Sequence, residues 1–381
     1  MAGRRCRTTP AMTSVLRAGA AAVLAGVLAA LMAGCGTATA ARQAGDIAAR
    51  APREPFGTIS EAGSTLLLPL AQSWAKGYHQ QYPSVTVNPA GGGSGVGIKD
   101  AIASTVDIGA TDAYLSSGDL VQNPALLNIP VVVSAQTVIY NLPTLGNGVH
   151  LQLSGIVLAG MYDGTITMWN DPKIGKLNPG VSLPPLKVVP FHRLDASGDT
   201  FLFTSYLSTE DPAQWGLNGY GTKVLWPPVP GAKQESGSTD MEKYCALTPG
   251  CVAYNGISYL QKALTDNLGE AELDNAAGQP ELPTTPAIQA AVAPFVSLTP
   301  PSETISMIDG PATAGYPIVN FEYAVVSKTQ PSAAKASEIK AFLQWVISTG
   351  NQPAYLNPLG FQPLPSDILT LDKAQIAEIG S

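Results

Sequence analysis

The chain has 381 residues, of which 45% are hydrophobic and 13% are charged. This length and composition suit two ordinary domains with a sizeable core and exclude a disordered chain. The formal net charge is −7, and it becomes −11 once the four arginines of the N-terminal segment are removed (−7 − 4). An acidic chain without a cluster of lysines and arginines argues against nucleic acid as a partner and against a membrane-binding face.

The N-terminal segment, residues 1–34, has the pattern of an export signal, because arginines precede an unbroken Ala-rich run with no acidic residue. The run ends in Leu-Met-Ala-Gly before Cys35. This ending is similar to the lipobox of bacterial lipoproteins, in which the cysteine carries lipid after cleavage. A plain signal cleavage site and an uncleaved membrane helix are the alternatives. Residues 35–56 predict a flexible tether, so we expect a lipid-anchored body on the extracytoplasmic face of the cell membrane.

Two cysteines remain in the predicted body, Cys245 and Cys251, on either side of a Pro-Gly turn. In an exported protein this pair predicts a small disulfide loop. A metal site is not expected, because the cysteines lack CxxC spacing and the histidines, His79, His150 and His192, are scattered. No cofactor is predicted.

The first two predicted helices each follow a strand and begin at residues that carry a hydroxyl group. Ser64 and Thr65 come after the strand-like residues 58–62 and precede a helix with apolar residues at helical spacing. Ser94 lies in the glycine-rich loop at residues 91–97, between a short strand and the next helix.

The glycine-rich loop does not match the nucleotide-binding motifs. Ile98 stands where GxxxxGK[ST] requires lysine, and GxGxxG lacks its last glycine. The glycines still let the main chain approach a ligand closely. The loop therefore fits a small anion and not a dinucleotide.

Asp112 follows the interior strand predicted at residues 106–110, at the carboxyl end where open α/β sheets gather their ligands. Capping of the next helix is the alternative role for this side chain. The long apolar run at residues 129–140 predicts a central strand that crosses between domains.

A third helix start, at Ser197, follows the strand predicted at residues 186–191. Gly198 and Asp199 stand in its first turn, where several backbone N–H groups are left unpaired and point at one place. Such a place holds an oxyanion, and Arg193 can offer it a planar fork of donors. For each helix start taken alone, capping for stability is the alternative.

The remaining segments continue the alternation of strands and helices. Residues 231–240 predict a polar loop that could reach a cleft, and residues 252–264 predict a strand that runs into a helix. Residues 269–286 predict a turn-rich surface insertion. Residues 318–326 predict a strand, and residues 339–347 predict an amphipathic helix. This alternation predicts an α/β fold of mostly parallel sheets flanked by helices, in two domains with a ligand cleft between them.

Asp112 discriminates between possible anions. If the helix starts converge, they form a cage for a tetrahedral oxyanion. Asp112 near Arg193 would stay ionised, and an ionised carboxylate only accepts hydrogen bonds. The site would therefore favour phosphate, which keeps a proton, over sulfate or molybdate, the next candidates.

Three stretches resemble the PstS-type phosphate-binding lipoproteins, and closely the actinobacterial branch of that family. They read EAGSTLLLPLAQSW at residues 61–74, GGGSGVGIKDAIASTVDIGATDAYLS at residues 91–116 and HRLDASGDTFLFTSYLS at residues 192–208. The resemblance implies a two-domain type II solute-binding protein. Such a protein delivers inorganic phosphate to the membrane permease of an ATP-driven importer and does no chemistry on it.

We expect a monomer whose first domain comprises residues 57–141 and 316–381 and whose second domain comprises residues 142–315. The resemblance also assigns the phosphate ligands. They are Ser64, Thr65, Leu66, Ser94, Asp112, Arg193, Ser197, Gly198 and Asp199, with Asp195 orienting the arginine.

This chain departs from the family pattern at several positions. Relatives carry an aromatic residue at position 66, a polar residue at 194, a glycine at 196 and a threonine at 199. Asp199 adds a second carboxylate close to the anion. It either accepts a proton of the ligand or points away and contributes only its N–H.

An exported phosphatase or esterase with Ser197 or Ser94 as nucleophile is the main alternative from another class. No GxSxG motif or partnering histidine supports it, and no cluster of Asp and His suggests two metals. A purely structural surface lipoprotein would leave the three stretches unexplained. We therefore expect a binding protein and not an enzyme.

Overall fold

The central strand of the fold is β4 (Leu126–Tyr140), in which every residue is buried. The computed structural model describes residues 56–145 and 148–381, and these belong to one compact unit. The first part of β4 pairs with β11 (Val319–Ser327) and its last part with β8 (Cys251–Gly256). A strand covered on both faces needs a continuous apolar and β-branched run, which is the pattern that predicted a central strand here.

The sheet of the described chain has eleven strands. Besides β4, β8 and β11 they are β1 (Gly57–Gly63), β2 (Val85–Ala90), β3 (Ile108–Thr111), β5 (Leu151–Leu153), β6 (Val189–Arg193), β7 (Lys233–Glu235), β9 (Gly269–Asp274) and β10 (Pro280–Glu281). The order along the main path is β2-β1-β3-β11-β4-β8-β6-β7, and β5 and β10 join through β9, which also pairs with β4.

Parallel pairing is confined to the flanking strands. β1 is parallel to β2 and β3, β6 to β7 and β8, and β5 to β9. β4 and β11 are antiparallel to all the strands that they pair with. The prediction of parallel sheets thus holds where strands alternate with helices. It does not hold at the centre, where β4 and β11 run antiparallel to their neighbours.

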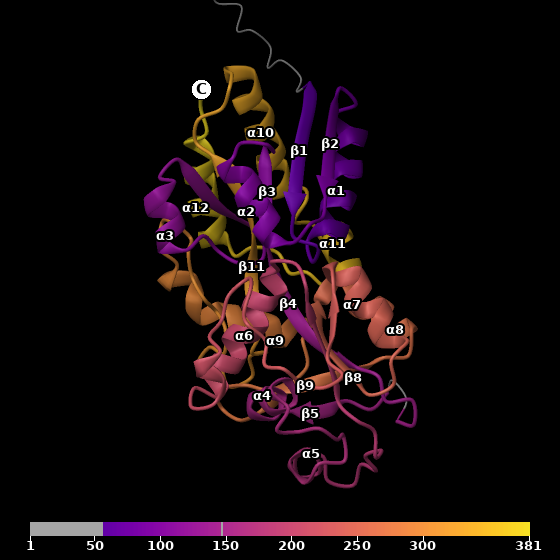
Figure 1. Cartoon of the computed structure of the whole chain (residues 1–381). Helices are drawn as coiled ribbons and strands as arrows, with labels where there is room; N and C mark the ends of the chain where they lie inside the picture. The colour runs from indigo at the N-terminus through magenta and orange to yellow at the C-terminus, as the bar shows by residue number, and fades with distance from the viewer. Residues whose placement is uncertain (1–55, 146–147) are drawn as a thin grey trace, which may run out of the picture. The chain divides into compact units, whose positions relative to one another are not determined.

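Helices flank the sheet (Figure 1). They are α1 (Leu68–Gln81), α2 (Ser94–Ile102), α3 (Ser117–Gln122), α4 (Gly155–Asp163), α5 (Pro172–Leu177), α6 (Gly198–Glu210), α7 (Gly237–Ala246), α8 (Leu260–Thr265), α9 (Thr285–Val292), α10 (Ala333–Val346), α11 (Pro353–Leu356) and α12 (Ser366–Ala377). α1, α2 and α10 lie against β1, β2 and β3, whereas α6, α7 and α8 lie against β8 and β9.

One predicted segment was wrong. Residues 269–286 were expected to form a surface insertion, but β9 is mostly buried and pairs with β4 and β5. Ala271 and Leu273 are buried apolar residues that alternate with acidic neighbours. This period of two is a strand signal, and the acidic residues concealed it.

The domain boundaries stay a prediction, although two features bear on them. β11, from the expected returning segment, pairs with β3 and with the first part of β4. The last part of β4 pairs with β8, from the expected second domain. The strand is therefore shared by both groups of elements.

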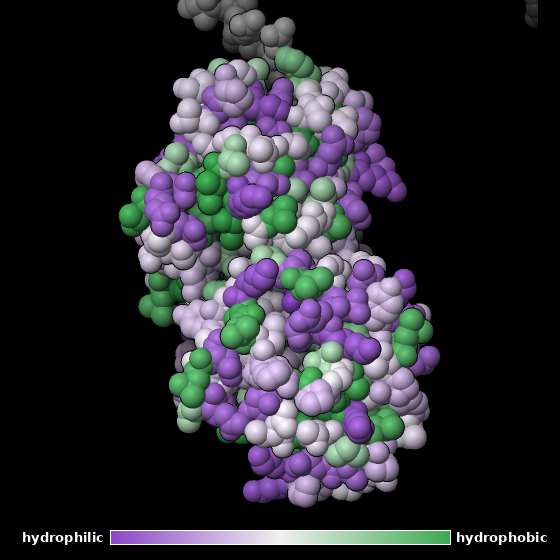
Figure 2. Space-filling view, viewed as in Figure 1, coloured by the Kyte–Doolittle hydropathy of each residue, from purple (hydrophilic) through white to green (hydrophobic). Residues whose placement is uncertain are grey.

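Buried aromatic rings and a disulfide consolidate the packing around β8. Tyr162 of α4 packs on Phe203 of α6 with ring centroids 4.8 Å apart. Cys245 and Cys251 form a disulfide between the end of α7 and the start of β8, as predicted. On the face shown in Figure 2, hydrophobic residues occur in small groups among hydrophilic ones.

Candidate functional site

The predicted site residues converge, although they come from four separate parts of the chain. The start of α6 lies so close to α2 and to the end of β3 that a Cβ at Gly198 would be 2.5 Å from both the Asp112 Oδ2 and the Ser94 Oγ. Only glycine permits this approach. The N–H of Gly95 also donates to the carbonyl of Ala196 at 2.9 Å, which ties the second and third helix starts together.

Ser197 is the N-cap residue of α6, but its side chain does not cap the helix. Its hydroxyl is buried and has no hydrogen-bond partner among the described residues. A buried polar group without a partner is costly. The capping explanation therefore fails for Ser197, and its hydroxyl and the first N–H groups of α6 remain available to an anion.

Ser64 and Thr65 lie in the turn that leads from β1 into α1. The Ser64 hydroxyl accepts from the N–H of Leu67 at 2.9 Å and donates to Asp112 Oδ1. Leu66 is fully buried, and its carbonyl accepts from the Ser258 hydroxyl at 2.7 Å. The leucine side chain packs against Gly256, so only its N–H can face a ligand.

The guanidinium of Arg193 is buried at the end of β6 and is held on two sides. Asp195 accepts from Arg193 Nε at 2.8 Å and also from Nη2, which is the orienting contact that was predicted. Nη2 also donates to the Thr65 hydroxyl at 3.1 Å. The ion pair holds the pKa of Asp195 below its usual range, against the effect of burial.

Asp199 is the second ion-pair partner of Arg193, and this corrects one prediction. Arg193 was expected to keep Asp112 ionised, but Nη1 donates to Asp199 Oδ2 at 2.7 Å, and its ion pairs are with Asp195 and Asp199. Gln136 of β4 donates to the other carboxylate oxygen of Asp199 at 3.1 Å. Burial, followed by the charge of Asp112, raises the pKa of Asp199 to about 6.

Asp112 lies directly after β3, as predicted, and is 2% exposed. Its carboxylate accepts from the Ser64 hydroxyl, and its N–H donates to the Ser94 hydroxyl at 3.1 Å. Ser94 is the first residue of α2 and not its cap, which is Gly93. Asp112 is thus an acceptor placed beside the donors of two helix starts.

Ser238, at the start of α7, was not predicted. Its N–H donates to the Thr65 hydroxyl at 3.1 Å, and its own hydroxyl donates to Asp199 Oδ2 at 3.1 Å. The loop before it was expected to reach a cleft. A Ser-Gly pair ahead of a helix, here Ser236 and Gly237, is the same pattern that stands at Ser197, so this signal could have found it.

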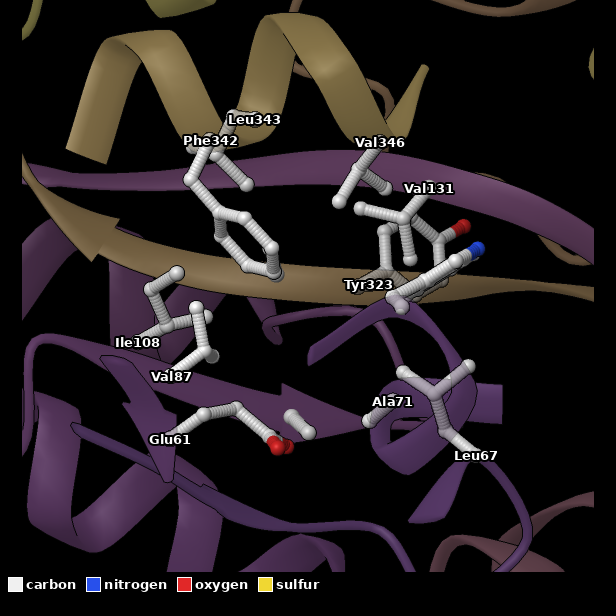
Figure 3. Close-up of a pocket in the computed structure, with 13 residues that line it drawn as sticks. Glu61, Leu67, Ala71, Val87, Ile108, Val131, Tyr323, Phe342, Leu343 and Val346 are labelled. Carbon is white, nitrogen blue, oxygen red and sulfur yellow. The ribbon is translucent and has the colours of Figure 1, made fainter. Parts of the chain in front are cut away.

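A separate cavity of about 30 Å³ lies between the sheet and helices α1 and α10 (Figure 3). Its walls are apolar except for Glu61, whose carboxyl group is buried and has no hydrogen-bond partner among the described residues. Burial raises the pKa of Glu61 to about 8. This volume suits about one water molecule, so the cavity is not a second anion site.

Several predictions fall outside the described residues, namely the export signal, the lipobox with Cys35 and most of the tether. In the described part of the chain, no helix is both long and apolar enough to span a bilayer. Nor does that part bring together three or more His, Cys, Asp or Glu side chains in a way that could hold a metal.

Comparison with known proteins gives consistent matches. The family model of the PBP superfamily domain matches residues 37–349. The phosphate-binding protein PstS of Methanocaldococcus jannaschii is 35% identical over 333 residues, which cover 81% of this chain and 83% of the relative. PstS3 of Mycobacterium bovis (strain BCG / Pasteur 1173P2) is 30% identical over 321 residues and covers 81% of this chain and 83% of the relative.

A solved structure shares the fold. A periplasmic phosphate-binding protein (PfluDING) bound with phosphate is 20% identical and has a TM-score of 0.62, with 84% of this chain and 92% of that chain covered. The predicted α/β fold of a type II solute-binding protein is therefore confirmed.

Proposed function

Because the chain belongs to the PstS-type phosphate-binding proteins of the PBP superfamily, we propose that it binds inorganic phosphate outside the cytoplasm. It delivers the ion to an ATP-driven importer and makes or breaks no bond in it. The main support is the buried hydroxyl of Ser197, which has no partner in the described chain and lies at the N-terminus of α6, where helices leave their first N–H groups without an intrahelical partner.

The ligand set consists of helix-start donors, one cation and one acceptor. Ser64, Thr65, Leu66, Ser94, Ser197, Gly198 and Asp199 supply hydroxyl or N–H donors, and Arg193 supplies positive charge. Ser238 joins this set, because it bridges Thr65 and Asp199. Donors fixed by secondary structure need no reorganisation when an oxyanion enters.

The side chain of Asp199 does not face the anion as an independent charge in this proposal. Arg193, Gln136 and Ser238 already supply donors to it. Its N–H, in the first turn of α6, is the group offered to phosphate. Asp195 keeps the arginine in place from the opposite side.

Asp112 accepts the proton that phosphate keeps at neutral pH. Sulfate has no such proton and would leave two facing acceptors without a bond between them. A site built to receive a hydrogen bond rejects the analogue that lacks it by several orders of magnitude in favourable cases. Phosphate is therefore preferred to sulfate and molybdate.

The protein works as a monomer at the outer face of the cell membrane. Lipid on Cys35 and the tether at residues 35–56 hold it there, next to the permease that receives phosphate. Binding closes the two predicted domains around the ion. The motifs at residues 61–74, 91–116 and 192–208 support a place in the actinobacterial branch of the family.

Isothermal titration of the purified protein with phosphate, sulfate and arsenate tests this function. We expect saturable binding of phosphate and at least about a hundredfold weaker binding of sulfate. The absence of phosphate binding would refute the proposal. Steady release of phosphate from a generic phosphoester, abolished by Ser197→Ala, would instead establish the enzyme alternative.

A further inference from the structure

Glu322 is a fully buried carboxyl group behind the site, and sequence analysis did not single it out. It lies on β11, where the pairing with β4 is irregular between Glu322 and Tyr323. Such an irregularity redirects a side chain. The neighbouring Tyr323 pairs with Thr111, the residue before Asp112, so β11 brings Glu322 beside the end of β3.

Asn320 connects Glu322 to Asp112. Its Nδ2 donates to Glu322 Oε1 at 3.0 Å and to the backbone carbonyl of Asp112 at 3.2 Å. The other carboxyl oxygen of Glu322 has no donor among the described residues. Asn320 therefore holds the Glu322 carboxyl group beside the backbone of Asp112, with one buried carboxyl oxygen free to donate if it carries a proton.

Two neighbouring carboxylates in a buried place repel each other, which favours the neutral form of Glu322. Burial, followed by the charge of Asp112, raises the pKa of Glu322 well above its usual value, and Asp199 adds to the effect. The buried cation of the site, Arg193, is already paired with Asp195 and Asp199. Tyr323, a further titratable neighbour of Glu322, is also buried and neutral. The proton therefore belongs to Glu322.

We propose that Glu322 is a positioning residue for the ligand: as a neutral carboxylic acid it donates to Asp112 and holds that carboxylate as the acceptor for the proton of phosphate. The inference rests on the proposed phosphate function. A hydrogen bond from a neutral acid to a carboxylate is charge-assisted and strong. It orients Asp112, so the acceptor is in place when the ion enters.

Titration of Glu322→Gln and Glu322→Leu with phosphate and sulfate, from about pH 6 to about pH 9, tests the role. The amide of Gln can donate as the acid does, so Glu322→Gln should bind phosphate within about threefold of wild type at neutral pH. It should lack the loss of affinity that ionisation of Glu322 causes in the wild type at high pH. Glu322→Leu offers no donor and should lose at least about tenfold in affinity and in discrimination against sulfate.

Glu303→Gln is the matched control, because Glu303 is an equally buried glutamate that accepts from Gln375 away from the site. This substitution should leave the pH profiles of phosphate binding and of sulfate binding unchanged. The inference is overturned if Glu322→Leu matches wild type in affinity, discrimination and pH profile, or if Glu322→Gln loses as much as Glu322→Leu. If the Leu variant does not fold, an unaltered high-pH profile in the Gln variant refutes the role. Failure of the wild type to bind phosphate would instead refute the proposed function.

Discussion

The buried carboxyl of Glu61 makes the stability of this protein depend on pH in a way that one substitution should remove. The side chain is 7% exposed and faces the small apolar cavity bounded by α1 and α10 (Figure 3). Neither oxygen has a partner in the described chain. Glu61→Gln keeps the shape of the side chain and abolishes its ionisation.

The sign and size of this pH dependence follow from the difference between the pKa of Glu61 in the folded chain and its pKa in the unfolded chain. The pKa of Glu61 is about 8 in the folded protein against 4.5 as its ordinary value. Between these values the folded state holds a proton that the unfolded state has released, so wild-type stability falls as pH rises. Each pH unit in this range lowers the free energy of unfolding by about 1.4 kcal/mol. The step from about pH 5 to about pH 7.5 therefore lowers it by about 3 kcal/mol, since the slope flattens near the folded pKa.

Urea unfolding of wild type and Glu61→Gln at these two pH values measures the effect. Other groups titrate equally in both proteins, so their contributions cancel in the difference. From the lower to the higher pH, we expect the free energy of unfolding of the variant to rise by about 3 kcal/mol relative to that of wild type. Glu61→Leu, which cannot titrate either, should show the same pH-dependent gain. A difference between wild type and Glu61→Gln that does not change with pH would refute the reasoning.

Three further predictions concern the site and the disulfide. Asp112→Asn should narrow discrimination between phosphate and sulfate by at least about tenfold in competition titrations, because the amide can also donate; an unchanged competition profile would remove Asp112 from the acceptor role. Arg193→Ala should weaken phosphate binding by about a hundredfold in calorimetry, whereas near-normal titration would place the arginine outside the site. Replacement of Cys245 and Cys251 by serine should lower the free energy of unfolding by about 2 kcal/mol, since the disulfide closes a short loop; equal denaturation midpoints for the variant and the oxidised wild type would contradict this.

Local sequence patterns were enough to find the elements that carry the site. The helix start at Ser197 and the strand before Asp112 were predicted from short-range signals alone, because caps, glycines and apolar runs act over a few residues. The resemblance supplied the orienting role of Asp195, and the contacts with Arg193 agree with it.

What the sequence could not predict are contacts between distant segments. Whether Arg193 pairs with Asp112 or Asp199 depends on which carboxylate the folded chain turns toward it, and spacing in the sequence does not encode that. Ser238 meets Thr65 across 173 positions. In the sequence, nothing distinguishes Glu322 from the other residues of its predicted strand. Its role depends on the pairing of β11 with β3 and β4.

The pairing of β4 also affects when the chain can fold during its synthesis. Val132 pairs with Glu322, a position 190 residues later (322 − 132), so the first part of this apolar strand lacks its β11 partner until that strand has left the ribosome. Until then an unpaired edge of this kind is open to aggregation. The strand that completes the centre of the sheet is thus among the last to be synthesised, so the first part of β4 stays unpaired for most of synthesis.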